Sequence, residues 1–414
     1  MAIRHAGHID RPYKRGNLWS AAGRNSKDKL VNIGVWDVIL WIVEGLVTFA
    51  VSTFIFDTVH WALHRWTKSR FALLRMFASW HHVHHRFLDG KMQVHMDLAA
   101  TNFWAHLVPE FLTSAAGTAV FYLFFHWIPV SAVMLLHVWN FANNIRTEGM
   151  DGNHMSMDRV SGQQSLFKVN AAYHAMHHIT PDNFYSSYLN VFDLLFGRSC
   201  TIRHRRFLIT GASGAFGSAM KARIEALGGV VETAKHGVDF LPAKLDQMRA
   251  KLERADVLIL AHGARGSDAW DANYTTFVEL ADFFITIGKD RLVPPEIWAV
   301  GSEAELHGDM GQADLVDYAA SKRAFAQRAV AYYRSPDVLY RHIVPSAFSS
   351  AMGPGPMSAD TAARIALFFI RRGFSYVPVT FTTLAFWNYF RFIRQSSVPQ
   401  PVQPRVAIDS GARR

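Results

Sequence analysis

The chain has 414 residues, of which 50% are hydrophobic and 18% are charged, with one cysteine and a net charge of +10. A single cysteine excludes an intramolecular disulfide framework and a cysteine-rich zinc module. The charged fraction is below the roughly 25% of an ordinary soluble domain, so enough apolar surface exists to exclude a mainly disordered chain. The basic excess suits a membrane surface or nucleic acid, but no nucleic-acid motif accompanies it. We therefore expect no nucleic-acid partner.

The first half of the chain predicts an all-α membrane domain over residues 30–204, after a basic tail at residues 1–29 that contains seven of the 43 basic residues. A bilayer core needs about 20 residues of helix. The apolar run at residues 30–61 therefore predicts a tilted span or a shallow hairpin broken near Gly45. A second apolar run predicts two helices, roughly at residues 111–125 and 130–141. The alternative is the buried helical core of a soluble protein.

The second half predicts an α/β domain with a parallel sheet over residues 205–380. Short apolar strands alternate with helical patterns, which is typical of that fold. The predicted strands lie at residues 206–210, 230–234, 256–260, 296–300 and 375–379, and a helix lies at 362–371. Residues 381–414 predict an amphipathic helix, lying on the membrane or on the first domain, followed by a disordered tail.

Three histidine clusters stand out in the first half. One has the pattern HxxxH and two have the pattern HxxHH, so each aims two or three imidazoles from one helix face. Neutral imidazole is a good ligand for iron, zinc and copper, and the number of nitrogens suffices for two metal ions. The candidate ligands are His60, His64, His81, His84, His85, His174, His177 and His178. We interpret the other histidines of this half, His5, His8, His95, His106, His126 and His204 among them, as ordinary core or surface residues.

The spacing of the clusters predicts one shared site. The segment between His64 and His81 is polar and too short to cross a membrane and return. The segment between His85 and His174 contains the predicted two-helix hairpin, which returns the chain to its starting side. All three clusters can therefore meet on one face of the membrane.

With these motifs, residues 35–200 resemble the fatty acid hydroxylase / sterol desaturase superfamily. The resemblance implies integral-membrane helices and an all-histidine di-iron site on the cytosolic face, with the eight histidines above as ligands. A further ligand is expected between the second and third clusters, where His137 or His154 could serve, and Asn143 and Asn144 lie nearby. The implied activity is O2-dependent hydroxylation or desaturation of a lipid. No heme or iron–sulfur motif is present, so an external donor of ferredoxin or cytochrome type is expected.

A glycine-rich turn, TGASGAFG at residues 210–217, follows an apolar strand and opens a helix. Glycines let the backbone approach a pyrophosphate, which is favoured at a helix N-terminus. The turn supplies the candidate cofactor-binding residues Gly211, Ser213, Gly214, Phe216 and Gly217. Tyr318 and Lys322 are four residues apart, so the ammonium group can lower the pKa of the phenol and hold a nicotinamide ribose. Ser302, at the end of a strand, is placed to bind a substrate oxygen.

Residues 205–380 thus resemble the short-chain dehydrogenase/reductase family. By this resemblance Tyr318 is the proton donor or acceptor, with Lys322, Ser302 and Asn273 assisting. The usual Asn-Asn-Ala-Gly is replaced by Leu-Ala-His-Gly ending at Gly263, a further candidate cofactor contact, and the domain is short after its second strand. Lys235 and His236 end that strand without an acidic residue, which favours NADP(H) over NAD(H).

Together the halves predict a membrane-bound lipid oxidoreductase. The di-iron half would hydroxylate or desaturate a fatty acyl, sterol-like or other isoprenoid lipid, and the fused half would interconvert alcohol and carbonyl with NADP(H). Both halves would face the cytosol, where the nicotinamide pool lies. Three alternatives stay open: a non-catalytic nucleotide-binding regulatory domain, a wax-type aldehyde or alkane pathway enzyme, and a non-enzymatic metal carrier.

Overall fold

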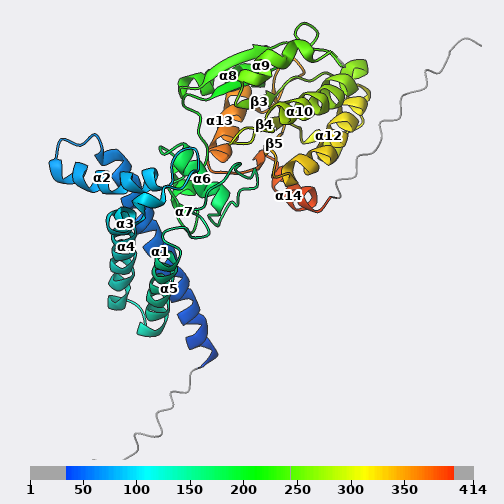
Figure 1. Cartoon of the computed structure of the whole chain (residues 1–414). Coiled ribbons are helices and arrows are strands. Elements are labelled where there is room, and N and C mark those ends of the chain that lie inside the picture. Colours follow the sequence, from blue (N-terminus) through cyan, green and yellow to red (C-terminus); the bar gives the residue numbers. More distant parts are fainter. Residues whose placement is uncertain (1–33, 243, 396–414) are drawn as a thin grey trace, which may run out of the picture.

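The computed structural model describes residues 34–242 and 244–395. The predicted basic tail and the predicted disordered end of the chain lie outside these residues. The described chain forms a helical half and a half built on a parallel sheet, as expected (Figure 1).

The helical half starts with one uninterrupted helix, α1 (Val35–Trp66), which makes the predicted hairpin near Gly45 wrong. One glycine costs a helix only about 1 kcal/mol relative to alanine, too little to break a long apolar helix. A Cβ atom at Gly45 would lie 3.6 Å from Cβ of Pro129, so this position also receives a neighbouring helix. At 1.5 Å per residue, α1 is about 48 Å long.

Two shorter helices, α4 (Val108–Ala119) and α5 (Trp127–Arg146), pack beside α1 as a hairpin. The three helices project away from the sheet half (Figure 1). Large apolar side chains are exposed along the projecting part, for example Trp36, Leu46, Leu123 and Trp139. Within the described residues, α1 is the one helix long and apolar enough to cross a membrane; its most apolar window has a mean hydropathy of 2.1 and is 17% buried.

The remaining helices of this half lie at the end of the bundle nearer the sheet half (Figure 1). They are α2 (Ala72–Phe87), α3 (Ala99–Asn102), α6 (Ala171–Ile179) and α7 (Val191–Phe196), and a π-helical turn (Phe103–Leu107) joins α3 to α4. Helices α1, α2 and α6 carry the three histidine clusters.

The second half contains a six-stranded sheet in which every neighbouring pair is parallel, in the order β2-β1-β3-β4-β5-β8. The strands are β1 (Arg206–Thr210), β2 (Val230–Ala234), β3 (Val257–Leu260), β4 (Glu296–Val300), β5 (Leu339–Pro345) and β8 (Tyr376–Val379); β6 (Phe348–Ser349) and β7 (Met357–Ser358) form a separate small pair. Compared with the doubly wound order 3-2-1-4-5-6, the sheet lacks the edge strand next to β2 and has an additional strand, β8, at the opposite edge. The missing strand agrees with the short segment expected after β2.

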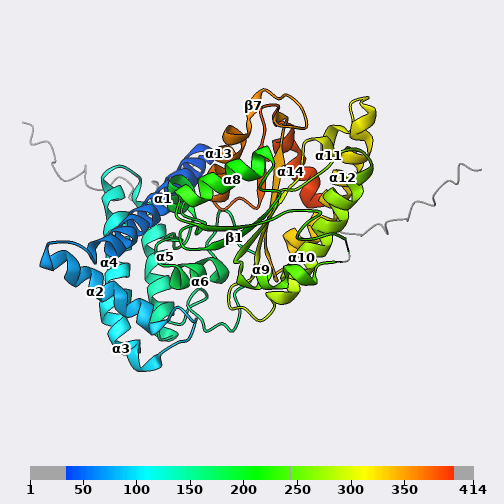
Figure 2. The same cartoon turned by 90° about the horizontal axis from the view of Figure 1, so that it is seen from above.

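Helices cover both faces of the sheet (Figure 2). They are α8 (Ala215–Ala226), α9 (Arg249–Arg254), α10 (Thr276–Ile287), α11 (Ala304–His307), α12 (Val316–Arg334), α13 (Ala359–Ile370) and α14 (Leu384–Arg394). One apolar core lies under α8 and α13, and a second lies under α10 and α12. Helix α14 packs against α12 and β8 of its own domain, and Phe392 is buried there, whereas Trp387 on its other face is exposed.

Backbone hydrogen bonds connect the two halves. The amide N of Val160 donates to the carbonyl O of Leu292 at 2.9 Å, and that of Gly162 donates to the carbonyl O of Pro336 at 2.7 Å. Gly162 is required at this contact, because a Cβ atom there would lie 2.2 Å from the carbonyl O of Val338. The helical half is therefore fixed against the sheet half.

Candidate metal centre and dinucleotide site

The three histidine clusters converge into two adjacent groups of imidazoles. In each group, one nitrogen from every ring lies within 4.8 Å of the others. The first group is His60, His64, His81, His85 and His177, and the second is His84, His154, His174 and His178. All eight predicted ligands are thus brought together, and His154 joins them from the loop before α6.

In the first group, hydrogen bonds fix the tautomers of two rings. Nδ1 of His60 donates to the carbonyl O of Tyr185 at 2.9 Å, and Nδ1 of His177 donates to that of Asn183 at 2.8 Å. A carbonyl only accepts, so both Nδ1 atoms carry hydrogen and both Nε2 atoms present lone pairs. These two Nε2 atoms nevertheless face each other at 2.9 Å. Burial also lowers the pKa of His177 well below its usual range, which disfavours a shared proton.

The second group also contains nitrogens that the protein alone does not pair. Nδ1 of His178 contacts the carbonyl O of Leu88 at 2.7 Å, and Nδ1 of His154 contacts the carboxylate of Asp151 at 2.8 Å. Buried nitrogens are left over: Nδ1 of His84 and Nε2 of His154 have no hydrogen-bond partner within the described residues. Buried polar atoms are normally paired, and these unpaired nitrogens point to a cation as the missing partner.

Sequence reasoning missed two residues beside this centre. We interpreted His106 as an ordinary residue, but its ring stacks on that of His84 with 3.8 Å between centroids. Its Nε2 lies 3.3 Å from the carboxylate of Glu110, one turn further along the chain. The four-residue spacing of His106 and Glu110 was the available signal. His137, the other candidate for a further ligand, lies apart, with Nε2 3.4 Å from Oγ of Ser52.

Two small cavities lead towards the centre. One is lined by five of its histidines and by His106, and the other lies between α4 and α5 and is lined by Phe111, His137 and Phe141 among others. Glu110 and Tyr188 line both cavities. The interior of the helix bundle therefore borders the imidazole groups through these two side chains.

The glycine-rich turn connects β1 to α8, with Ser213 exposed in the turn and Phe216 buried at the start of the helix. Gly211 has φ +74°, and a Cβ atom there would lie 2.5 Å from the backbone of His262. A Cβ atom at Gly217 would lie 2.3 Å from the carbonyl O of Gly211. The turn is thus as tight as a backbone that approaches a pyrophosphate requires.

A cavity of about 490 Å³ opens at the carboxyl ends of β3, β4 and β5. Phe216, Gly263, Ser302, Tyr318 and Lys322 all line it. Burial raises the pKa of Tyr318, and a hydrogen bond with Ser302 opposes that rise. The expected lowering of the phenol pKa by Lys322 is therefore not found; burial lowers the pKa of Lys322 itself to about 8. Its ammonium group donates to the carbonyl O of Val300 at 2.8 Å.

Asn273 lies in a π-helical turn before α10 and is fully buried. Its amide donates to the carbonyl O of Ala264 at 2.8 Å and to Oγ of Ser321 at 3.1 Å. A Cβ atom at Gly263 would lie 2.7 Å from the side-chain oxygen of Asn273, so the glycine permits this contact.

His262, in the Leu-Ala-His-Gly segment, connects the glycine-rich turn to the helix behind it. Its Nδ1 lies 2.7 Å from Oγ1 of Thr210, and its Nε2 lies 2.9 Å from Oγ1 of Thr276. Lys235 is exposed at the end of β2 and outside the residues that line the cavity. An acid does stand at that strand end, because Asp239 accepts a hydrogen bond from the amide N of Lys235 at 2.7 Å. The prediction that this strand ends without an acidic residue is therefore wrong.

The parallel sheet, the tight glycine turn and the Ser–Tyr–Lys cavity define the second half as an enzyme domain of the oxidoreductase type, resembling short-chain dehydrogenases/reductases. No family model matches the chain. A curated relative, monoglucosyldiacylglycerol epimerase from Synechocystis sp., is 25% identical over 248 residues, which cover 53% of this chain and 60% of the relative.

Among solved structures, a short-chain dehydrogenase from Burkholderia cenocepacia in complex with NADP is 15% identical, with coverage of 47% of this chain and 96% of that chain and a TM-score of 0.38. A short-chain dehydrogenase from Sphingobium yanoikuyae in complex with NADPH is 19% identical, with coverage of 48% of this chain and 98% of that chain and a TM-score of 0.37.

Proposed function

We propose that the chain is a membrane-bound lipid oxidoreductase that joins an O2-dependent di-iron centre to an NADP(H)-dependent alcohol/carbonyl site. The single observation that supports the di-iron centre best is the pair of Nε2 lone pairs of His60 and His177 at 2.9 Å. Two facing lone pairs repel unless a cation lies between them. Imidazole is a common ligand of iron, and two adjacent groups of such rings suit two ions.

In this proposal, the two histidine groups hold the metal, and iron bound there supplies the activation of O2 with electrons from an external ferredoxin or cytochrome. The backbone carbonyls of Tyr185, Asn183 and Leu88 fix the tautomers of the ligands that contact them. Such outer contacts orient metal-bound imidazoles and raise their basicity. The cavities that share Glu110 and Tyr188 have room for only one or two water molecules each, so a lipid from the bundle would enter only after side chains there move.

At the second site, Tyr318 is the proposed proton donor and acceptor. A bound NADP(H) supplies or accepts the hydride. The raised pKa of Tyr318 keeps the phenol protonated at neutral pH, the form that donates a proton to a carbonyl oxygen as hydride reaches its carbon. Ser302, which hydrogen-bonds to Tyr318, would hold the same oxygen, while Asn273 supports the backbone before α10.

Membrane attachment through α1 completes the proposal. This helix is longer than the roughly 30 Å of a bilayer core, and within residues 34–242 and 244–395 its outward apolar side chains, such as Trp36 and Leu46, are exposed. Its basic last turn, with His64 and Arg65, would then lie on the same side as the sheet half. Both sites would face the cytosol and its nicotinamide pool.

A second candidate function follows from the curated relative, which is named as an epimerase of a glucosyl lipid. A Tyr–Lys site of this kind suits epimerisation, because removal of hydride from a sugar carbinol and its return to the other face invert one carbon without net redox change. The lipid substrate would then be a glycolipid, and the metal centre would act on another part of it.

The test is a comparison of lipids from a host that expresses the wild-type chain, His84→Ala/His85→Ala or Tyr318→Phe, in air. We expect the wild type to produce an oxygenated or desaturated lipid, which disappears in the histidine variant, while Tyr318→Phe accumulates the alcohol or carbonyl intermediate. An inverted sugar headgroup that depends on Tyr318 alone would favour the epimerase. Unchanged products with Tyr318→Phe would favour a regulatory nucleotide domain.

A further inference from the structure

A basic cavity lies at the junction between the two halves. Its volume is about 420 Å³, within the range of cavities that hold small ligands. The helical half contributes the end of α1 and the loop after α6, and the sheet half contributes residues at the ends of α8 and α13. The charged lining residues and the one histidine are Arg65, Asp182, Arg198, Arg203, His204 and Arg371.

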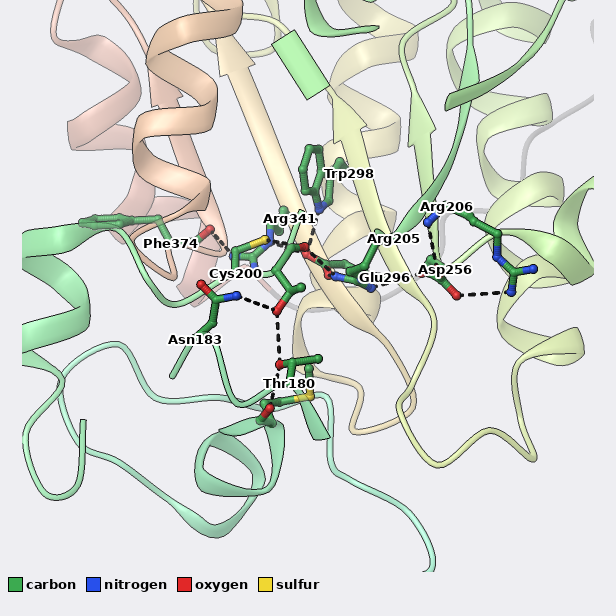
Figure 3. Close-up of polar contacts among 12 residues, drawn as sticks. Thr180, Asn183, Cys200, Arg205, Arg206, Asp256, Glu296, Trp298, Arg341 and Phe374 are labelled. Carbon is green, nitrogen blue, oxygen red and sulfur yellow. Dashed lines mark hydrogen bonds and ion pairs between the residues drawn. The ribbon is translucent and has the colours of Figure 1, made fainter. Parts of the chain in front are cut away.

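Four arginines thus face one carboxylate, and none of the four guanidinium groups makes a hydrogen bond or ion pair within the part of the chain that the structure describes. Arginines a few residues away behave differently. Arg205 contacts the carboxylate of Glu296 at 2.5 Å, and Arg341 contacts the same carboxylate at 2.7 Å (Figure 3). The junction therefore pairs the arginines that it buries and leaves unpaired those that face the cavity.

Unpaired guanidinium groups around one hollow repel one another, and an anion between them would convert that repulsion into attraction. Arginine is suited to this task, because its planar fork matches the oxygens of phosphate and carboxylate. A phosphate ester carries up to two negative charges and three acceptor oxygens, which meets an excess of several positive charges better than one carboxylate does. We propose that this junction cavity binds a phosphate-bearing ligand, either a soluble phosphate compound or the headgroup of a phospholipid.

The wall of the cavity also contacts the first histidine group. Asn183 lines the cavity, and its carbonyl O accepts the hydrogen bond from Nδ1 of His177. The side chain of Asn183 donates to Oγ1 of Thr201 at 3.3 Å, and Thr201 donates to Oγ1 of Thr180 at 3.1 Å (Figure 3). A ligand that orders this wall would therefore hold the ring of His177 in place. The binding itself does not depend on the proposed function.

The experiment uses the full chain in detergent, with inorganic phosphate, dioctanoyl phosphatidic acid and the zwitterionic dioctanoyl phosphatidylcholine as probes in calorimetric titrations. The test variant is Arg198→Gln/Arg371→Gln. The matched control is Arg364→Gln, an exposed arginine of α13 outside the cavity. The single variant Arg203→Gln, at an exposed position of the same cavity, replaces the double variant if that one does not fold.

We expect the wild type and the control to bind at least one of the two anionic probes equally, and the double variant to bind it at least ten-fold more weakly. Binding of phosphatidic acid alone would identify a lipid headgroup as the source, and binding of inorganic phosphate would identify a soluble one. The proposal is overturned if neither anion binds the wild type, if phosphatidylcholine binds as tightly as phosphatidic acid, or if the cavity variants bind like the control.

Discussion

The histidine centre and the dinucleotide site differ in how far the protein alone completes them. At the dinucleotide site three central polar groups have protein partners, since Lys322 donates to Val300, Asn273 donates to Ala264, and His262 contacts two threonines. Only Nε of Arg265, among the buried side-chain atoms that line this cavity, has no partner within the described residues, apart from one carboxylate oxygen of neighbouring Glu305. In the histidine centre the Nε2 lone pairs of His60 and His177 lie 2.9 Å apart, and buried nitrogens remain unpaired. The dinucleotide site is therefore stable without its ligand, whereas the histidine centre needs a bound cation to stabilise it.

The largest expected effect follows from removing the metal. A ligand that binds the folded state at about 1,000 times its Kd stabilises it by about 4 kcal/mol, so chelation should lower the melting temperature of the chain and added Fe²⁺ should restore it. Replacement of His60 or His177 by alanine should abolish the oxygenated lipid product and reduce the iron content, measured by mass spectrometry. His82→Ala is the matched control, because His82 lies on α2 among the ligands but is exposed and outside both groups. Full iron content in the His177 variant would contradict the assignment.

The next effect separates the two sites. Tyr318→Phe removes the proton donor, and loss of general acid catalysis typically costs 10²- to 10⁴-fold in rate. We expect NADPH-dependent carbonyl reduction to fall by about that factor, while iron content and NADPH affinity stay at wild-type values. Carbonyl reduction is followed by NADPH absorbance. A loss of iron in this variant would mean that the two sites are not independent.

The two sites also differ in how much of each could be predicted from the sequence. The glycine turn and the Tyr–Lys pair are short motifs on one strand–turn–helix and one helix, so spacing predicts them. The eight clustered histidines are predictable for the same reason. His154 was predictable only as one of two candidates beside His137, because it is a single histidine in an irregular loop and only the fold brings it to the others. Asp239 was overlooked because it reaches the end of β2 from a turn beyond the strand.

The fold shows the same limit, because features that depend on long-range contacts could not be predicted from the sequence. Strand patterns located five of the six strands of the main sheet, since each depends on local periodicity, but β5 was not among them. The predicted hairpin overestimated the cost of Gly45 to a helix, which is only about 1 kcal/mol. The close approach of Pro129 to this position is long-range and could not be predicted from the sequence. The unpaired arginines of the junction cavity are dispersed along the chain, so their grouping could not be predicted from the sequence either.

A third effect tests the buried ion-pair cluster around Glu296 in the sheet half. Glu296 is 1% exposed and accepts from Arg205, Arg341 and the indole N–H of Trp298. Glu296→Gln leaves two buried guanidinium groups without a counter-charge, and breaking a buried pair costs about 3–5 kcal/mol. We expect a loss of that size in urea unfolding. The exposed pair partner Glu225 provides the control, since Glu225→Gln removes only a surface ion pair with Lys221, worth about 0–1 kcal/mol.

The pH dependence of stability gives an independent check on Glu296. Burial alone would raise its pKa, but the charges of Arg341 and Arg205 outweigh burial and lower the pKa from its ordinary 4.5 to about 2. A carboxylate whose pKa is depressed by folding stabilises the chain above its unfolded pKa and loses that effect as pH falls towards the folded pKa. The wild type should therefore lose stability between about pH 4.5 and pH 2, and Glu296→Gln should lose less over the same range. Equal slopes for the two proteins would contradict this role.

The smallest expected effect on stability concerns the glycine-rich turn, where a side chain at Gly217 would collide with the backbone. Gly217→Ala would place a Cβ atom 2.3 Å from the carbonyl O of Gly211, against 3.3 Å for Gly214→Ala. Overpacking costs about 1–3 kcal/mol, so Gly217→Ala should fall in that range and Gly214→Ala below it. Because the backbone must move to admit the methyl group, NADPH affinity, measured by fluorescence titration, should fall more in the Gly217 variant. Iron content should stay the same in both, since β1 and α8 provide no histidine ligand. If the two variants lost NADPH affinity equally, contact with the nucleotide rather than the closeness of the turn would decide the glycine requirement.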